Sequence, residues 1–352
     1  MESLPYEFNP YTFARISAMK SQLLQKEDYD KLLKMDASEI TKYLQEGTYR
    51  EEISRISIRY SGIKLIENVI NLHLSKIFIK LKRISDPSTE KLMNLYLRRY
   101  DFWNIKTVLR AKISEYKEDE LNDILLPVGT LDLGEFKQIF AKATVAAMLE
   151  ESGLVEMKEM KEILSRFEES KDLSDIENML DQKYLTDTLA TADRISEEGR
   201  LFKDFFRFEV DIFNMKLILK KIFFQLDKSY VSGYIVKGGN ELTDRQLKSL
   251  LDKPDFKSFL KELTKTSYAK IFDNIKDDND DLLLKCEVQL EEFLLKKCFL
   301  LFHQHPLSVD IVLGYMFAAE IEARNIRAII KSRMLEFTQD YVKKLIIIKK
   351  SR

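Results

Sequence analysis

The sequence predicts an all-α protein, and three observations support this fold class. The chain has 352 residues but only ten glycines and six prolines, so few residues interrupt helices. In several long segments, residues 63–84 among them, apolar side chains cover a wide helical face. A short helical signature also occurs three times at nearly constant spacing. Such spacing indicates an internal triplication, and the chain is long enough for two or three domains.

The signature centres on Asn104, Asn214 and Asn325, which are 110 and 111 residues apart. Each asparagine follows an acid by three positions and precedes basic residues at +2 and +6. The acids are Asp101, Asp211 and Glu322, and the bases are Lys106 with Arg110, Lys216 with Lys220, and Arg327 with Lys331. A second set of markers, Glu67, Glu177 and Glu287, precedes the asparagines by 37, 37 and 38 residues. Two markers in register through three copies predict modules at 1–118, 119–228 and 229–352.

Local signals place the helices of each module. The first module is expected to have helices at 11–24, after Asp36 in a capping box with Glu39, at 63–84 and at 87–113. The second has them at 135–148, 154–167 and 173–195, with another after Gly199; the third has them at 243–251, 256–263, 281–302 and 307–333. Loops are expected at 125–134 and around Gly233, Gly238 and Gly239. Each unit is thus predicted to be a hairpin of two antiparallel long helices with smaller helices at its mouth.

The signature places a carboxylate within the apolar stripe of its helix and the asparagine at the edge of that stripe. A buried carboxylate costs several kcal/mol unless it is paired or hydrogen-bonded. We therefore expect a structural polar contact, to loop backbone or to a helix N-terminus of the same or the next module. The bases fall outside the stripe. They form either a solvated face or a ring of positive charge that three equivalent helices offer to a partner.

Composition excludes several function classes. With 57 basic and 58 acidic side chains, the net charge of −1 gives no reason to expect nucleic acid as a partner. The apolar runs are too short to cross a bilayer, no signal peptide is evident, and Cys286 and Cys298 read as reduced cysteines of a cytosolic protein. Phosphate-loop, dinucleotide and HExxH motifs are missing.

Two groups of residues offer weak metal motifs, and neither carries a metal prediction. His303 and His305 near Cys298 are better explained by a turn at Pro306 than by a metal site. The acidic run at 277–281 lacks the glycine and the terminal glutamate of a calcium loop. No cofactor or metal is therefore expected, and the balance favours a scaffold or coupling role over catalysis.

Three blocks of sequence carry a family resemblance. They are Tyr-Thr-Phe-Ala-Arg-Ile at 11–16, Tyr-Asp-Phe-Trp-Asn-Ile-Lys at 100–106 and Glu-Ile-Glu-Ala-Arg-Asn-Ile-Arg at 320–327. In combination and order they resemble the C subunit of the archaeal and bacterial A-type (V-type) ATP synthase, which is related to the d subunit of eukaryotic vacuolar ATPases. The resemblance covers essentially the whole chain, although the second module lacks a proline at its hairpin turn.

The resemblance implies a funnel of three helical modules around a pseudo-threefold axis, with a central cavity. Such a protein sits as one copy between the central shaft (D- and F-type subunits) and the membrane rotor ring. It transmits torque there, peripheral to the cell membrane on its cytoplasmic side, without catalytic or cofactor-binding residues. Two alternatives remain from the residues alone: a generic helical-repeat scaffold that binds a peptide or protein, and an α-helical enzyme whose motif acids converge in one pocket.

Overall fold

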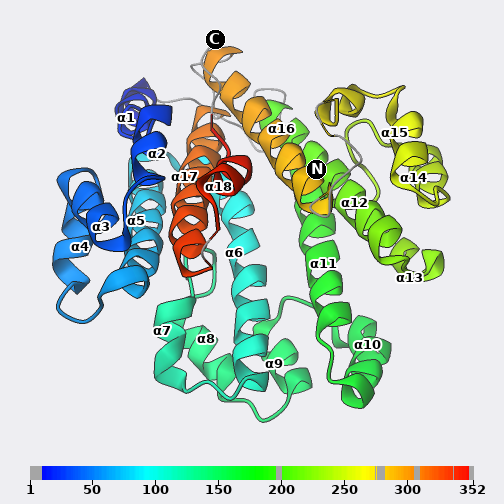
Figure 1. Cartoon of the computed structure of the whole chain (residues 1–352). Coiled ribbons are helices and arrows are strands. Elements are labelled where there is room, and N and C mark those ends of the chain that lie inside the picture. The colour runs from blue at the N-terminus through cyan, green and yellow to red at the C-terminus, as the bar shows by residue number, and fades with distance from the viewer. Residues whose placement is uncertain are drawn as a thin grey trace.

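The computed structural model describes residues 10–195, 200–273, 275, 282–304, 310–335 and 337–348, without the side chains of 201 and 298–304. Every regular element in these ranges is a helix, which confirms the all-α prediction (Figure 1). Several predicted features lie outside the described residues. They are Gly199, the acidic run at 277–281, the turn at 305–306, and the side chains of Cys298 and His303.

Six long helices form the body of the molecule. They are α5 (Gly62–Ile84), α6 (Pro87–Ile113), α11 (Ser174–Ala192), α12 (Arg200–Phe224), α16 (Leu282–Gln304) and α17 (Asp310–Met334). We call α6, α12 and α17, which carry the three asparagines, the signature helices, and α5, α11 and α16, which carry the glutamate markers, the marker helices. Neighbours follow one another as α5, α17, α16, α12, α11 and α6, and α6 in turn contacts α17. Signature and marker helices therefore alternate, and each signature helix packs against the marker helix of the following copy.

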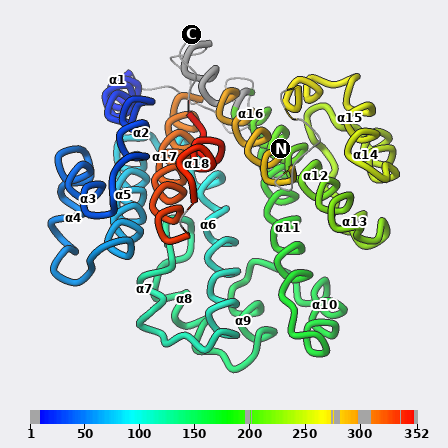
Figure 2. The backbone as a smooth tube through the Cα atoms, viewed as in Figure 1, coloured from blue at the N-terminus to red at the C-terminus, as the bar shows by residue number. Residues whose placement is uncertain are grey.

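Smaller helices gather in three groups around this body (Figure 2). The first group packs on α5 and α17, the second on α6 and α11, and the third mainly on α12, with η3 on α16. The groups are α1 (Pro10–Lys20), α2 (Lys26–Leu32), α3 (Ala37–Glu46) and α4 (Arg50–Ile56); η1 (Glu118–Glu120), α7 (Leu121–Ile124), α8 (Leu133–Phe140), α9 (Val145–Ser152) and α10 (Met157–Ser170); and α13 (Lys228–Ser232), α14 (Asp244–Leu251), α15 (Phe256–Leu263) and η3 (Ser267–Ile271). The last helix, α18 (Gln339–Leu345), returns to pack on α16 and α17.

Two helix starts with a clear capping residue match the sequence prediction. The Asp86 side chain accepts hydrogen bonds from the backbone N–H groups of Ser88 and Thr89, at 2.9 and 3.0 Å, with Pro87 at the first helical position. Asp36 forms the expected capping box with Glu39 at the start of α3. These side chains satisfy N–H groups that the first helical turn leaves free, so nearby residues alone determine where the helix begins.

Two expectations about helices are wrong. The single helix expected at 135–148 is interrupted between α8 and α9, because Thr144 caps a new helix by accepting from the N–H of Ala147 at 3.2 Å. The first long pair does not pack as a hairpin along its length: α5 lies mainly against α17 and the small helices α3 and α4, whereas α6 lies mainly against α11 and α8. The pairs α11–α12 and α16–α17 do pack side by side.

Aromatic rings join the three signature helices at the centre. The ring of Phe205 on α12 lies 5.5 Å from that of Phe317 on α17 and 6.1 Å from that of Tyr96 on α6. Tyr96 and Phe205 are almost fully buried, and Phe317 is 6% exposed. Offset and edge-on aromatic contacts of this kind add to the stabilisation from burial. The aromatic contact therefore holds the three signature helices at a fixed spacing.

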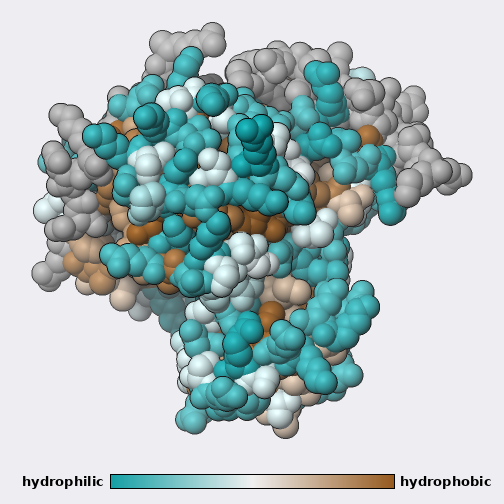
Figure 3. Space-filling model, turned by 90° about the vertical axis from the view of Figure 1, so that its right-hand side faces the viewer, coloured by the Kyte–Doolittle hydropathy of each residue, from teal (hydrophilic) through white to brown (hydrophobic). Residues whose placement is uncertain are grey.

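The outer surface is mostly hydrophilic, with small separate apolar areas on the face that Figure 3 shows. A broad upper body and a narrower lower lobe are visible from this side. None of the helices in the described ranges is both long and apolar enough to span a bilayer.

Candidate functional site

The three signature asparagines each hold one residue of a loop that lies 22 positions downstream. The amide Nδ2 donates to the backbone carbonyl of that residue, and its backbone N–H donates back to Oδ1. The pairs are Asn104 with Leu126 (2.8 and 2.9 Å), Asn214 with Val236 (2.7 and 3.0 Å) and Asn325 with Ile347 (2.7 and 2.8 Å). All three asparagines are at most 1% exposed. A buried backbone segment outside a helix thus obtains both of its hydrogen bonds from one side chain.

The acids of the first two copies bind the same loops a few residues further on. Asp101 accepts from the N–H groups of Thr130 and Leu131, at 2.9 and 3.1 Å, and from the Thr130 hydroxyl. Asp211 accepts from three consecutive backbone N–H groups, beginning at Asn240 (2.9 Å), and from the hydroxyl of Tyr268 (2.6 Å). Burial raises the pKa of the Asp211 carboxyl, while these donors oppose that rise. The acids are therefore structural ligands of loop backbone.

The acid of the third copy binds the opposite end of the chain. Glu322 accepts from the backbone N–H of Leu24 at 2.5 Å and from the hydroxyl of Tyr49 at 2.7 Å. The side chain is 4% exposed, and burial raises its pKa. The first group of small helices therefore supplies to α17 the donors that downstream loops supply to α6 and α12.

A buried acid on α4 holds this N-terminal group against α5. Glu52, which is 4% exposed, lies 3.0 Å from the Lys76 amine and 3.4 Å from Nδ1 of His73. Burial alone would raise the pKa of Glu52, but its contacts with His73 and Lys76 outweigh that effect and lower the pKa to about 2.

The low pKa of Glu52 predicts a specific acid sensitivity. A depressed folded-state pKa gives stability that is present above the ordinary value near 4.5 and lost as the pH falls through about 2. The shift corresponds to roughly 3 kcal/mol. Melting temperatures of Glu52→Gln should therefore be lower than those of the parent at pH 7, and the difference should shrink as the pH falls from 4.5 toward 2. The exposed acid variant Glu168→Gln is the control. A difference between Glu52→Gln and the parent that is the same at every pH would contradict the assignment.

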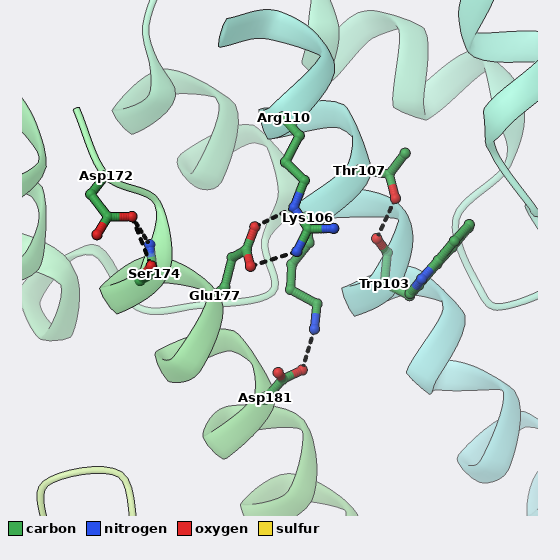
Figure 4. A network of polar contacts seen from close by, with 8 residues as sticks. All are labelled: Trp103, Lys106, Thr107, Arg110, Asp172, Ser174, Glu177 and Asp181. Carbon is green, nitrogen blue, oxygen red and sulfur yellow. Dashed lines mark hydrogen bonds and ion pairs between the residues drawn. The ribbon is translucent and has the colours of Figure 1, made fainter. Parts of the chain in front are cut away.

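Signature bases contact polar residues of the marker helix of the next copy across the helix seams, and Figure 4 shows the first of these seams. Arg110 makes a bidentate contact of 2.5 Å to Glu177, and Lys106 lies 2.5 Å from Asp181. In the other seams Lys216 lies 2.8 Å from Glu291, Lys331 lies 3.7 Å from Glu67, and Arg327 donates to Asn71. The sequence contained one signal for these pairs: Asn71, Asp181 and Glu291 all stand four residues after a marker glutamate.

Three residues at equivalent positions also converge at the centre. Arg99, Glu209 and Glu320 each stand five residues before a signature asparagine. An Arg99 nitrogen lies 2.8 Å from a Glu209 oxygen and another lies 3.8 Å from Glu320. Tyr96 and Tyr100 donate hydroxyl hydrogen bonds to Glu320, at 2.6 and 2.7 Å. Burial raises the pKa of Glu209, which Arg99 opposes. This cluster was not predicted, although its spacing of 110 and 111 residues is visible in the sequence.

A cavity of about 530 Å³ opens beside this central cluster. Residues from all six long helices line it, and Arg99, Glu209 and Glu320 are among them. Of the six signature bases, Lys216, Lys220 and Arg327 reach it. A larger cavity of about 720 Å³ lies between α1, α4 and α5, and is lined from that one part of the molecule. Every copy therefore contributes to the cavity of about 530 Å³, whereas the larger one is lined by the first copy alone.

The fold and its centre define a helical scaffold of three related copies whose motif residues serve contacts between helices and loops. Comparison with known proteins gives the family. The family model described as ATP synthase (C/AC39) subunit matches residues 12–345. The chain belongs to this family, and it is therefore an accessory subunit of a rotary ATPase complex. The resemblance found in the sequence is confirmed.

Individual relatives match over almost their whole length. The C subunit of the A-type ATP synthase from Methanococcoides burtonii is 30% identical over 96% of this chain and 94% of its own. The protein of the same name from Methanosarcina barkeri is 31% identical, with 96% and 92% covered, and that from Haloquadratum walsbyi is 29% identical, with 95% and 97% covered.

Proposed function

We propose that this protein is the socket of a central stalk, which couples the shaft of the soluble catalytic head to the membrane rotor ring. Its three copies form a funnel around a pseudo-threefold axis, with boundaries at 1–118, 119–228 and 229–352. The shaft, made of D- and F-type subunits, enters the central cavity, and the other end rests on the ring. One socket serves each complex, and it is peripheral on the cytoplasmic side of the membrane. It transmits torque and takes no part in catalysis.

One observation carries this proposal: residues at the same position of the three copies converge on a cavity that all six long helices line. A rod seated there would contact every copy at once, so turning it would load all three together. The arrangement also suits stiffness, because aromatic packing and paired charges tie each signature helix to its neighbours. We further propose that Lys216, Lys220 and Arg327 meet the shaft. Arg110 and Lys331, whose side chains are 57% and 60% exposed, remain predicted partner contacts together with Lys106.

Site-specific cross-linking tests the socket. A photoreactive phenylalanine derivative replaces Lys220, which is exposed and lines the cavity. On illumination of the assembled complex we expect this position to cross-link to a component of the shaft. The matched control carries the same residue in place of Lys158, which is 77% exposed on α10, away from the cavity. Cross-links to the shaft from position 158 alone, or from neither position in an intact complex, would contradict the proposal.

A further inference from the structure

The three seams between signature and marker helices differ in charge. In the first seam each base meets an acid, since Lys106 pairs with Asp181 and Arg110 with Glu177. In the third seam the place of Asp181 is taken by Asn71, so Arg327 donates to a neutral amide. The structure therefore breaks threefold equivalence at one defined position of the cavity wall.

A second difference adds positive charge near the third seam. The residue before the signature asparagine is Trp103 in the first copy and Phe213 in the second, but Arg324 in the third. Arg324 lines the cavity and contacts Glu291, which Lys216 also contacts at 2.8 Å. One carboxylate is thus shared between two cations, while Arg327 nearby has its neutral partner. The cavity lining on α12, α16 and α17 has four basic residues and three acidic ones: Lys216, Lys220, Arg324 and Arg327 against Glu209, Glu291 and Glu320.

The electrostatics of these groups agree with the geometry. Burial lowers the pKa of both guanidinium groups. Glu287 opposes this effect at Arg324, and Tyr100, Glu67 and Glu320 oppose it at Arg327. Burial also lowers the pKa of the Lys216 amine to about 8, and nearby Arg324 adds to the effect. The negative charge near these buried cations does not fully offset the cost of burying them, so a further carboxylate beside them would stabilise their charged forms. Arg99 does not add to the surplus, because Glu209 and Glu320 both face it.

We propose that Arg324 and Arg327 form a receptor for an acidic side chain at the tip of the shaft, and that this one receptor fixes the angular position of the shaft in the socket. The inference rests on the proposed socket function. A socket with three equivalent walls would accept the rod in three orientations 120° apart. Because the carboxylate receptor occurs on one wall, a single orientation is favoured, and the shaft turns with the socket instead of slipping between equivalent positions. Arginine suits the role, since its planar fork binds a carboxylate through two hydrogen bonds.

Binding of the purified shaft proteins to this protein tests the receptor. The double variant Arg324→Gln/Arg327→Gln should weaken binding by roughly tenfold or more, as expected for loss of charged hydrogen bonds. Binding by the variant should also depend less on salt concentration. The control is Arg98→Gln, whose arginine pairs with Asp187 at 3.0 Å and does not line the cavity.

The variant Asn71→Asp separates partner binding from a structural role. It gives the third seam the acid that the other seams have, so Arg327 gains an internal partner. We expect the free energy of unfolding to stay equal or rise while shaft binding falls several-fold. A purely structural Arg327 predicts equal or higher stability with unchanged binding, and that result would overturn the receptor.

Orientation is read from cross-links at the equivalent positions 110, 220 and 331, of which 220 lines the cavity and 110 and 331 are the exposed predicted partner contacts. In the parent protein, each position should cross-link to a different set of shaft residues, which mass spectrometry identifies. In the double variant, the three positions should reach overlapping sets, because the rod then seats in more than one orientation. Distinct sets in the variant, with parent-like affinity, would refute the receptor alone. Failure of the parent protein to bind the shaft would refute the socket function itself.

Discussion

Replacing Gly239 by alanine is expected to be one of the most destabilising single substitutions in this protein. A methyl group there would lie 1.8 Å from an oxygen of Asp211 and 2.6 Å from its carboxyl carbon. Either the carboxylate or the loop must move, and both changes break the hydrogen bonds that Asp211 accepts from the following backbone N–H groups. We expect a loss of about 3–5 kcal/mol, the range for a buried charge deprived of its partners. Chemical and thermal denaturation measure it.

A double-mutant cycle isolates this cause. Asp211→Ala should itself destabilise, but in that background Gly239→Ala has no carboxylate to displace. The two changes should therefore be non-additive by at least about 2 kcal/mol. Gly129→Ala repeats the experiment in the first copy, where the new methyl would lie 2.1 Å from Asp101. Gly47→Ala is the control, since its nearest atom lies 3.6 Å away. Additive effects of the two substitutions would show that the steric account is wrong.

The second large effect is expected for Asn325→Ala. This substitution removes both hydrogen bonds to Ile347, whose N–H and carbonyl oxygen then remain buried and unpaired in a residue that is 2% exposed. Each unsatisfied group costs about 1–3 kcal/mol, so the two together cost about 2–6 kcal/mol. Because the contact ties the segment after α18 to α17, amide hydrogen exchange should accelerate at Ile347 more than in the distant α8–α10 group.

The control for this prediction is Asn122→Ala. Asn122 also donates to a backbone carbonyl, that of Asp119 at 2.7 Å, but the contact is local and exposed. Its loss should change the melting temperature little. Equal effects of the two asparagine substitutions would contradict the importance of the buried pair.

The sequence predicted the parts of this fold that local chemistry determines. The bounds of α6 and α15 agree with prediction because Asp86 and Asp255 cap them. Short helices such as α2, α4 and α13 were not predicted, since five to seven residues carry too little periodicity. The partner of Asn214 could not be predicted either, because a backbone group such as that of Val236 has no side-chain signature.

The central contacts were missed for a different reason. Arg99, Glu209 and Glu320 differ in charge, so a search for residue types shared by the copies passes over them, although they occupy one position. The pairing of Arg110 with Glu177 depends on which helices become neighbours. Prediction assumed that the long helices of each unit pair with each other, whereas each signature helix also packs against the marker helix of the next copy. The spacing of the repeated residues does not predict these contacts unless the order of neighbouring helices is also known.

The hydrogen bond from Leu24 to Glu322 has a consequence for biosynthesis. The two residues are 298 positions apart, so Leu24 emerges from the ribosome long before Glu322 is synthesised. Helices α3 and α4 can pack on α5 as soon as it is made, but α1 also packs on α17, so the docking surface of the N-terminal group is complete only after α17 has been synthesised. Closure of the N-terminal region comes late, and until then the nascent segment is exposed to chaperones and proteases.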